Sequence, residues 1–237
     1  MTKKLVLFCL LALSLSAAAQ NVQNAPRPVE GIWIFKIGKS SFEVTNQVAT
    51  EMNTTIKMAK TAREIFRSSA PAIFELERNT DGDKKRPFRA PYCEGTRVFY
   101  FNEYKVGRGA NPIILRDVYL TFRNGILIQI FSEQPTGFLP PFTSVHAQGT
   151  RSTKTDSTVC SYDGKKETMP NFKYVDQWDS GAIRAASVQK YYYDKDCQRR
   201  KDMFFEVYAQ QELTEALTCE NQMRAKFVAA KLTDLDL

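Results

Sequence analysis

Gly38, Lys39 and Ser40 form the triplet that closes a phosphate-binding loop of the type G-x-x-x-x-G-K-[ST], which would hold a nucleotide. That loop needs another glycine at position 33, where this chain has Trp33. Without the glycine, the backbone amides cannot fold around a phosphate. We therefore interpret the triplet as a strand-to-helix turn, in which Ser40 is the N-cap and Glu43, three residues later, completes a capping box.

Histidine-dependent chemistry rests on a single residue, His146. A hydrolase triad would have to use it, but the chain has no G-x-S-x-G motif and His146 stands in a Ser- and Thr-rich stretch. A zinc site would need ligands from distant parts of the chain, because no two of the later cysteines have a C-x2-4-C spacing. We assign no catalytic, cofactor-binding or metal-ligating residue and expect no cofactor.

Two further kinds of site leave weaker signals in the sequence. The 26 acidic residues allow many carboxylate pairs of the kind that hydrolyse glycans, but none stands in a locally apolar setting that would shift its pKa. Tyr191, Tyr192 and Tyr193 could form a platform for a carbohydrate or a peptide. Alternating tyrosines near a strand end more often lie half in the core and half at the surface.

The first 19 residues have the organisation of a secretory signal peptide. Lys3 and Lys4 are its positive region, residues 5–15 are its apolar region, and small residues up to Ala19 form the cleavage site. An uncleaved anchor is the alternative. We expect cleavage near Ala19 and a secreted or periplasmic protein, with a flexible N-terminal segment over residues 20–29.

Charge and hydropathy limit the partners of the mature chain. Removal of residues 1–19 takes away two lysines and no acid, which changes the formal net charge from +7 to +5. This excess is spread among many acids, whereas a nucleic-acid interface would need clustered basic residues and a recognisable motif. No later segment approaches the roughly 18 consecutive apolar residues of a spanning helix, so we expect no transmembrane span in the mature chain.

Export also changes how the cysteines are interpreted. Cys9 lies inside the signal peptide, and four cysteines remain in an oxidising compartment. An even number in that compartment predicts two disulfides, and three connectivities stay open. The four residues are Cys93, Cys160, Cys197 and Cys219.

Apolar periodicity predicts the first elements. Apolar and β-branched residues over 31–38 indicate a strand that stops at Gly38. Over residues 44–66, apolar side chains recur within a narrow arc at about 100° per residue, which predicts a helix. Pro71 ends this helix, and residues 72–77 are a short strand candidate.

Residues 97–106 and 118–131 have the composition of strands, and the second range contains the strongest local signal in the chain. Asn124 and Gly125 are the preferred pair for a two-residue type I′ hairpin turn. The second strand of this hairpin is apolar on both faces, which indicates a central position in the sheet. Pairing outward from the turn sets Phe122 opposite Leu127, Leu120 opposite Gln129 and Val118 opposite Phe131.

The rest of the chain predicts strands followed by a helix. Residues 135–171 are rich in Pro, Thr, Ser and Lys and are expected to be a linker or long loop. Residues 182–193 and 203–209 form an antiparallel pair, and a helix from Glu212 to Leu232 has Cys219 on its inward face. These elements predict an α+β fold with an antiparallel sheet and two principal helices. We expect two halves of similar size, residues 30–134 and 172–237.

Two short stretches carry a resemblance to known proteins. They are IGKSSFEV, residues 37–44, and LTFRNGIL, residues 120–127. Their order along the chain resembles that of small exported bacterial α+β domains grouped with the outer-membrane assembly lipoprotein SmpA and with the β-lactamase-inhibitor-protein fold. The resemblance implies a non-enzymatic envelope or binding role. The chain departs from the group by its long middle segment and by the absence of a lipidation cysteine.

The catalytic signatures that need histidine, glycine-rich loops or metal-ligand spacing are missing from this sequence. We therefore expect an exported, non-enzymatic binding or interaction protein of the bacterial cell envelope, whose partner is a macromolecule, a protein and not a nucleic acid. The alternative is a carboxylate-based hydrolase that acts on glycans. The sequence leaves open the identity of the partner, the oligomeric state and any catalytic acid pair.

Overall fold

The computed structural model describes residues 26–60, 62–66, 70–77, 93–107, 112–162 and 165–233. The predicted signal peptide lies outside this part of the chain. In chain order the elements are β1 (Gly31–Ile32), β2 (Phe35–Lys36), α2 (Glu43–Glu51), β3 (Ile56–Ala59), α3 (Ala62–Phe66), β4 (Ile73–Leu76), β5 (Thr96–Val106), β6 (Ile113–Arg123), β7 (Ile126–Gln134), the 3-10 helix η1 (Pro135–Gly137), α4 (Leu139–His146), β8 (Thr150–Tyr162), β9 (Lys165–Ser180), β10 (Ile183–Tyr193), β11 (Arg199–Ala209) and α5 (Gln210–Thr233).

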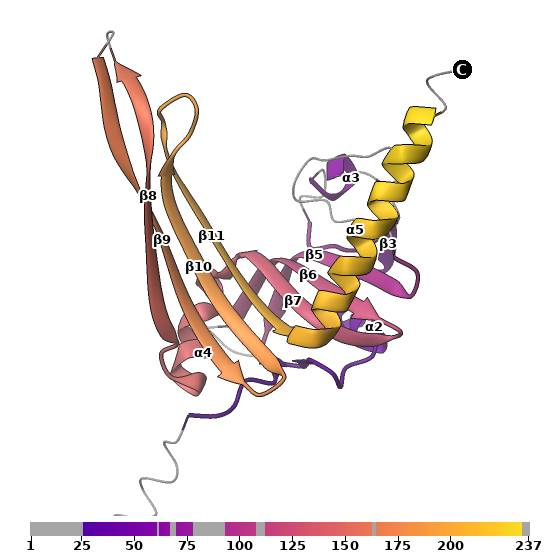
Figure 1. Ribbon diagram of the computed structural model, residues 1–237. Helices are drawn as coiled ribbons and strands as arrows, with labels where there is room; N and C mark the ends of the chain where they lie inside the picture. The colour runs from indigo at the N-terminus through magenta and orange to yellow at the C-terminus, as the bar shows by residue number, and fades with distance from the viewer. Residues whose placement is uncertain are drawn as a thin grey trace, which may run out of the picture.

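One large sheet organises the described residues. Its nine strands have the order β3-β4-β5-β6-β7-β11-β10-β9-β8, while β1 and β2 form a separate small hairpin. In Figure 1 the sheet continues from β5, β6 and β7 into the long strands β8 to β11. The protein therefore contains both helices and strands, as the α+β prediction requires. The prediction of a purely antiparallel sheet is wrong, because β3 and β4 run parallel to each other. The described part of the chain also has four α-helices rather than two principal ones.

Both errors, in the direction of the strands and in the number of helices, involve the single helix predicted over residues 44–66. The helix α2 ends at Glu51, and Asn53 has a left-handed backbone with φ of 51°. Asparagine tolerates that conformation at a helix end, and the residues that follow are β-branched and favour a strand. The range therefore holds α2, β3 and α3. The helix α3 connects β3 to β4, and such a crossover lets the two strands run in the same direction.

The hairpin predicted at Asn124 and Gly125 is confirmed. Both residues have positive φ, 50° and 83°, as a type I′ turn requires. Phe122 pairs with Leu127 as expected, but a bulge between Thr121 and Phe122 shifts the register beyond that pair. As a result Leu120 lies opposite Ile130 instead of Gln129, and Val118 lies opposite Ser132 instead of Phe131.

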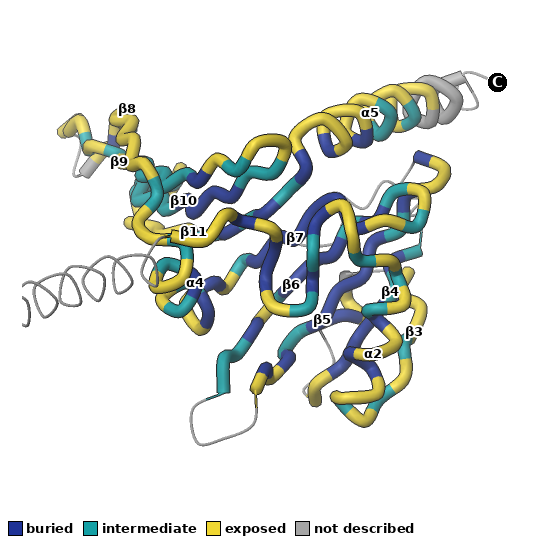
Figure 2. Tube along the Cα trace, turned by 90° about the horizontal axis from the view of Figure 1, so that it is seen from below, coloured by how far each residue is buried: buried dark blue, intermediate teal, exposed yellow. Residues whose placement is uncertain are grey.

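The large sheet is covered on both faces. On the face that we call the α2/α4 face, Phe101, Leu120 and Phe205 belong to a core that is covered by β1, β2, α2 and α4. On the opposite face, the α3/α5 face, Tyr100 and Tyr119 belong to a second core that includes Ile65 of α3. Figure 2 shows the buried residues concentrated along β5, β6 and β7.

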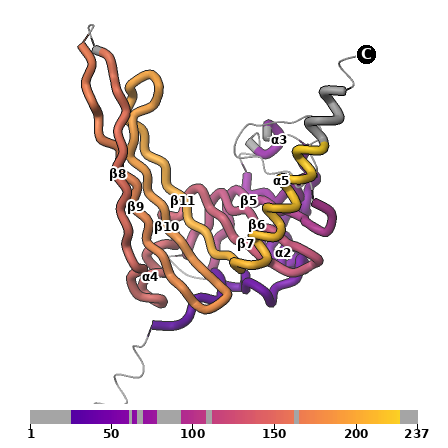
Figure 3. Tube along the Cα trace, viewed as in Figure 1, coloured from indigo at the N-terminus to yellow at the C-terminus, as the bar shows by residue number. Residues whose placement is uncertain are grey.

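Two hairpins, β8–β9 and β10–β11, extend far beyond this core (Figures 1 and 3). The strand β11 pairs with β7 only from Phe205 to Tyr208. We call the parts of the hairpins beyond this contact, residues 153–174 and 189–203, the arm. Range 135–171, predicted as a linker or long loop, contains η1, α4, β8 and the first part of β9. The division of the chain into two halves stays a prediction.

The cysteines lie in two pairs. Cys93 pairs with Cys219 of α5 across 126 residues, and Cys160 pairs with Cys197 across 37 residues. The Cα separations of 5.7 and 5.6 Å suit disulfides. The first pair connects α5 to the start of β5, and the second connects the ends of the two arm hairpins. Among the helices of the described residues, none has the length and apolar character needed to cross a membrane.

Candidate functional site

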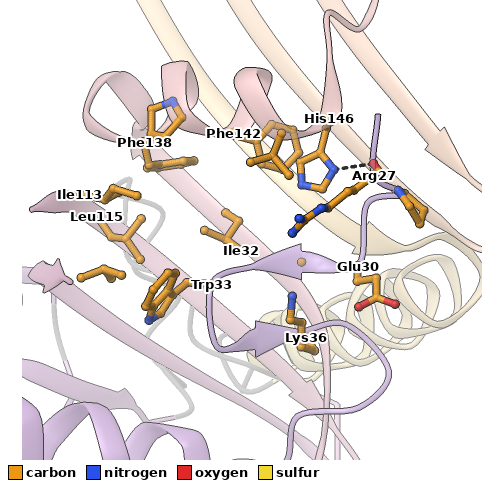
Figure 4. A pocket seen from close by; sticks show the side chains of 15 residues that line it. Arg27, Glu30, Ile32, Trp33, Lys36, Ile113, Leu115, Phe138, Phe142 and His146 are labelled. Atoms are coloured by element: carbon orange, nitrogen blue, oxygen red, sulfur yellow. Dashed lines mark hydrogen bonds between the residues drawn. The ribbon is translucent and has the colours of Figure 1, made fainter. Parts of the chain in front are cut away.

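A pocket of about 550 Å³ lies where three separate segments of the chain meet (Figure 4). One wall is the β1–β2 hairpin, another is α4, and Val106, Ile113 and Leu115 from the ends of β5 and β6 form the third. The volume is within the range of small-molecule binding sites. The pocket is lined mainly by apolar side chains, which is also typical of such sites.

The β1–β2 hairpin replaces the strand predicted over residues 31–38. Trp33 has a left-handed backbone with φ of 54°, which breaks the strand in two. Gly31 permits the tight return of the chain, because a Cβ at that position would collide with the carbonyl oxygen of Phe35. A bulky aromatic residue in this conformation is strained, and such strain persists where the surrounding structure requires it. Trp33 is 53% exposed and borders the pocket.

The Gly-Lys-Ser triplet supports this hairpin. The Ser40 hydroxyl accepts a hydrogen bond from the Lys36 amide at 2.8 Å and donates one to the Ile34 carbonyl at 3.1 Å. The predicted capping box is wrong, because the N-cap of α2 is Phe42 and no side chain caps that helix. Ser40 instead satisfies the backbone of the β1–β2 turn. The triplet is structural, as expected, but it stabilises a wall of the pocket and not a helix end.

The helix α4 forms the second wall. Its first turn contains Pro140 and Pro141, which suit positions where backbone amides have no helical partner. Phe142 points from this helix into the core and is 7% exposed. Its ring contacts those of Phe205 and Trp178 at centroid distances of 4.8 and 5.3 Å. This side of the pocket is therefore part of the main core.

Charged groups gather at the rim. Arg27, Lys36 and Glu30 border the pocket, and in Figure 4 the ends of Arg27 and Lys36 point toward the same space. Glu30 pairs with Lys39 outside the lining at 3.1 Å, and the hydrogen bond from Lys39 lowers the pKa of Glu30. Arg27 and Lys36 form no ion pair with any described residue. Lys36 also lowers the pKa of Glu30 through its charge, but neither Lys36 nor Arg27 is held in a direct ion pair, so both can approach a ligand.

His146 also lies at this pocket, and its contacts are structural. Its Nδ1 lies 2.7 Å from the carbonyl oxygen of Arg27, and its ring is tilted against that of Phe142 with the ring centroids 4.4 Å apart. Because a carbonyl oxygen only accepts, Nδ1 carries the proton in this contact. The described lining contains no Ser, Thr or Cys, and its single carboxylate is Glu30. Neither a catalytic triad nor a carboxylate pair is assembled at this pocket.

The three adjacent tyrosines lie in the arm. Tyr191 packs edge-on against Tyr174 at 6.1 Å on the α2/α4 face, and Tyr193 has the same orientation along the strand. Tyr192 lies on the opposite face, where its hydroxyl donates to Asp202 at 3.1 Å. All three are half-buried. They do not form a single platform, because neighbouring residues of a strand alternate between faces.

A second cavity of about 570 Å³ lies on the arm and contains two carboxylates, Asp156 and Asp202. Asp156 is on β8 and Asp202 is on β11, with β9 and β10 between them. Three strand spacings separate their backbones by about 14 Å. Among the described residues, no three His, Cys, Asp or Glu side chains are grouped as metal ligands.

Sequence reasoning did not find the pocket. Its lining comes from residues 27–36, 106–115 and 138–146, and apolar residues in a pocket cannot be distinguished from core residues in a sequence. The break at Trp33 had no sequence signal, because tryptophan suits the apolar run in which it stands and its left-handed backbone is visible only in the structure. Comparison of the chain with protein-family models, with curated proteins and with solved structures found no match to any of them.

Proposed function

We propose that this protein is an exported, non-enzymatic binding protein that holds an elongated apolar ligand with a terminal carboxylate, such as a fatty acid. The observation that carries the proposal is the apolar pocket of about 550 Å³ with Arg27 and Lys36 at its rim. The cysteine pairs agree with an exported protein. A small ligand is a narrower class than the protein partner expected from the sequence, and that partner stays a separate prediction.

The energetics of such a ligand are favourable. Each buried methylene group contributes about 0.8 kcal/mol, so a chain of roughly twelve contributes on the order of 10 kcal/mol before the costs of association. The carboxylate needs a polar partner when its chain enters an apolar site. Arg27 and Lys36 supply positive charge at the rim, where the head group can keep part of its water.

Binding is favoured over hydrolysis because the pocket lacks the groups that hydrolysis needs. A glycosidase requires two carboxylates, whereas Glu30 is the single acid in the described lining and is paired with Lys39. The pocket walls are also apolar, while a glycan presents many hydroxyl groups that would lose hydrogen bonds there. No observation in the described residues favours the hydrolase alternative.

The test is titration of the mature protein with fatty acids of increasing length and with alcohols of the same chain lengths. We expect saturable binding of one acid per protein. The double variant Arg27→Gln/Lys36→Gln should weaken acid binding about tenfold and leave alcohol binding unchanged. Lys57→Gln/Arg63→Gln is the matched control, because it removes one lysine and one arginine that are exposed and do not line the pocket.

Two results would contradict the proposal. One is a failure of every acid and alcohol to bind. The other is equal weakening of acid binding by the control Lys57→Gln/Arg63→Gln, which would assign the effect to the net charge of the protein instead of the rim of the pocket.

A further inference from the structure

Three lysines lie directly opposite one another on adjacent strands of the arm. Lys154 of β8 pairs with Lys173 of β9, and Lys173 pairs with Lys190 of β10. Directly paired residues share one face of a sheet, with Cβ atoms about 4.5–5.5 Å apart. This row lies on the α3/α5 face, because Phe204, two residues from the partner of Lys190, packs against the core of that face.

Such a row costs stability. Like charges directly opposite each other on a sheet are destabilising, and Lys173 has a lysine on both sides. None of the three lysines forms an ion pair with a described residue. Lys190 has a weak compensating contact, since its Nζ lies 5.9 Å from the ring centroid of Phe204. The repulsion between the three lysines is therefore offset only in part by neighbouring side chains.

Two acids lie near the row and offset part of its charge. Asp202 ends the row opposite Lys190, and its carboxylate also accepts a hydrogen bond from the Tyr192 hydroxyl at 3.1 Å. Asp156 lies two residues beyond Lys154 on β8. Arg200 adds no free charge, because it pairs with Asp194 at 2.6 Å. The cavity lining thus contains three lysines against two carboxylates.

The row borders the arm cavity of about 570 Å³, which forms where the two hairpins separate. Pairing between β9 and β10 stops at Phe172 and Tyr191. Beyond that point the Asn171 side chain fills the gap, since it accepts from the Tyr193 amide and donates to the Thr158 hydroxyl, both at 3.0 Å. The Cys160–Cys197 pair connects the hairpins further out. The cavity is therefore held open by specific contacts.

We propose that this cavity binds a phosphate group that carries two or more negative charges, such as a phosphomonoester or a diphosphate. Lysine is a compact point charge and a common phosphate ligand. A multiply charged anion among the three ammonium groups would remove their mutual repulsion, whereas a single carboxylate would neutralise less of it. The inference is independent of the ligand proposed for the apolar pocket, which lies on another part of the molecule.

The same chemistry could come from a soluble phosphate ester or from a lipid head group, and two probes distinguish these sources. Inorganic pyrophosphate, titrated calorimetrically at low salt, tests the soluble source. Vesicles of phosphatidic acid in phosphatidylcholine, assayed by co-sedimentation, test the membrane source. We expect binding of at least one probe, and we expect it to weaken as salt is added.

The informative variant is Lys173→Thr, at the centre of the row. It should weaken phosphate binding at least tenfold and, without anions, should raise the thermal unfolding midpoint, because it relieves repulsion and threonine suits a strand. Lys201→Thr is the matched control. It removes the same charge from the same arm on the opposite face, where Lys201 lies over the Tyr191 ring at 5.5 Å.

Each outcome decides the proposal. Binding of pyrophosphate alone assigns a soluble phosphate ester, binding of vesicles alone assigns a lipid head group, and binding of both supports a site for the phosphate group itself. Each assignment requires that Lys173→Thr weakens binding at least tenfold and that Lys201→Thr does not. Absence of binding to both probes would overturn the proposal. Equal losses in the two variants would overturn it too, because they would show attraction to net charge instead of a built site.

Discussion

The apolar pocket and the arm cavity have nearly equal volumes, about 550 and 570 Å³, but different construction. The pocket is lined by residues that also form the main core, such as Phe138, Phe142 and Leu115. The arm cavity is lined by polar and charged residues of a sheet whose two faces both contact solvent over much of their length. Close packing maintains the shape of the apolar pocket. Strand pairing, the hydrogen bonds of the Asn171 side chain and the Cys160–Cys197 disulfide maintain the shape of the arm cavity.

This difference determines how each site can vary. A change in the pocket wall alters the packing of the whole domain, so binding and stability should change together. A change in the arm alters a surface that contributes little to the core, so the site can change while the fold persists. Four predictions examine this contrast, in order of decreasing expected effect.

The largest contrast is expected between two phenylalanines. Phe142→Ala should lower the free energy of unfolding by about 3–5 kcal/mol, because it leaves a cavity in the core beside Phe205. Phe172→Ala in the arm should cost less than about 1 kcal/mol, because Phe172 is 36% exposed. Urea denaturation of both variants measures the difference. Similar losses would show that the arm is as tightly integrated as the pocket.

The second contrast concerns the arm disulfide. Cys160→Ala/Cys197→Ala should lower the free energy of unfolding by roughly 2–4 kcal/mol, because the disulfide closes a loop between residues 37 positions apart. Fatty-acid binding to the folded variant should be unchanged, whereas phosphate binding should weaken. Thiol counting on denatured, unreduced wild-type protein provides the control and should find no free thiol among Cys93, Cys160, Cys197 and Cys219. A loss of fatty-acid binding would contradict the separation of the two sites.

The third contrast is a pH dependence. Burial, followed by its hydrogen bond to Glu51, raises the pKa of Tyr104. The folded state then holds this proton more tightly than the unfolded state, so the contribution to stability is full below pH about 10 and is lost as the pH rises further. Tyr104→Phe should be roughly 1–2 kcal/mol less stable at pH 8. Its difference from wild type should shrink above pH about 10.

Tyr192→Phe is the matched variant in the arm. Partial burial and a hydrogen bond to Asp202 also raise the pKa of Tyr192, but this contact is at the surface, where solvent screens it. Denaturation curves between pH 8 and 11 should therefore show a smaller change for this variant. An equal or larger change would contradict the contrast between the regions.

The smallest change in stability is expected at Trp33. Trp33→Gly relieves the left-handed backbone, worth about 1–2 kcal/mol, while it adds freedom to the unfolded chain and removes side-chain contacts. These effects should nearly cancel, leaving the free energy of unfolding within about 1 kcal/mol of wild type. Fatty-acid binding should nevertheless weaken, because a pocket wall is lost. Unchanged binding would show that Trp33 is not part of the ligand site.

Signals from neighbouring residues predicted where several strands and helices lie, but not where the backbone changes direction or how the strands pair. The turn at Asn124 and Gly125, the β10–β11 pair and the helix after residue 210 were predicted correctly, because each depends on neighbours in the sequence. The prediction failed where one residue redirects the backbone. Asn53 ends α2, Trp33 divides a strand, and the bulge at Thr121 and Phe122 shifts a register.

The arm was missed for a different physical reason. The strand β8 has the sequence TRSTKTDSTVCSY, which lacks the alternation of apolar and polar residues that identifies a half-buried strand. Its strand character comes from β-branched threonines and from pairing with β9, which forms thirteen residue pairs from Thr150 to Tyr162. The two candidate sites were also invisible, since both combine residues that are distant in the sequence. The row of lysines in particular depends on register across three strands.

The position of β8 at the margin of the sheet has a consequence for self-association. A long outer strand offers its unpaired amides and carbonyls as a template on which another molecule can add a strand, which is a route to aggregation. Here Lys154 and Asp156 lie on one face of that strand and Arg151 lies on the other, and charged side chains at an edge discourage such addition. At the opposite margin, β3 spans four residues and offers a short template. The polar composition that made β8 hard to predict thus also opposes the addition of a strand from another molecule at this edge.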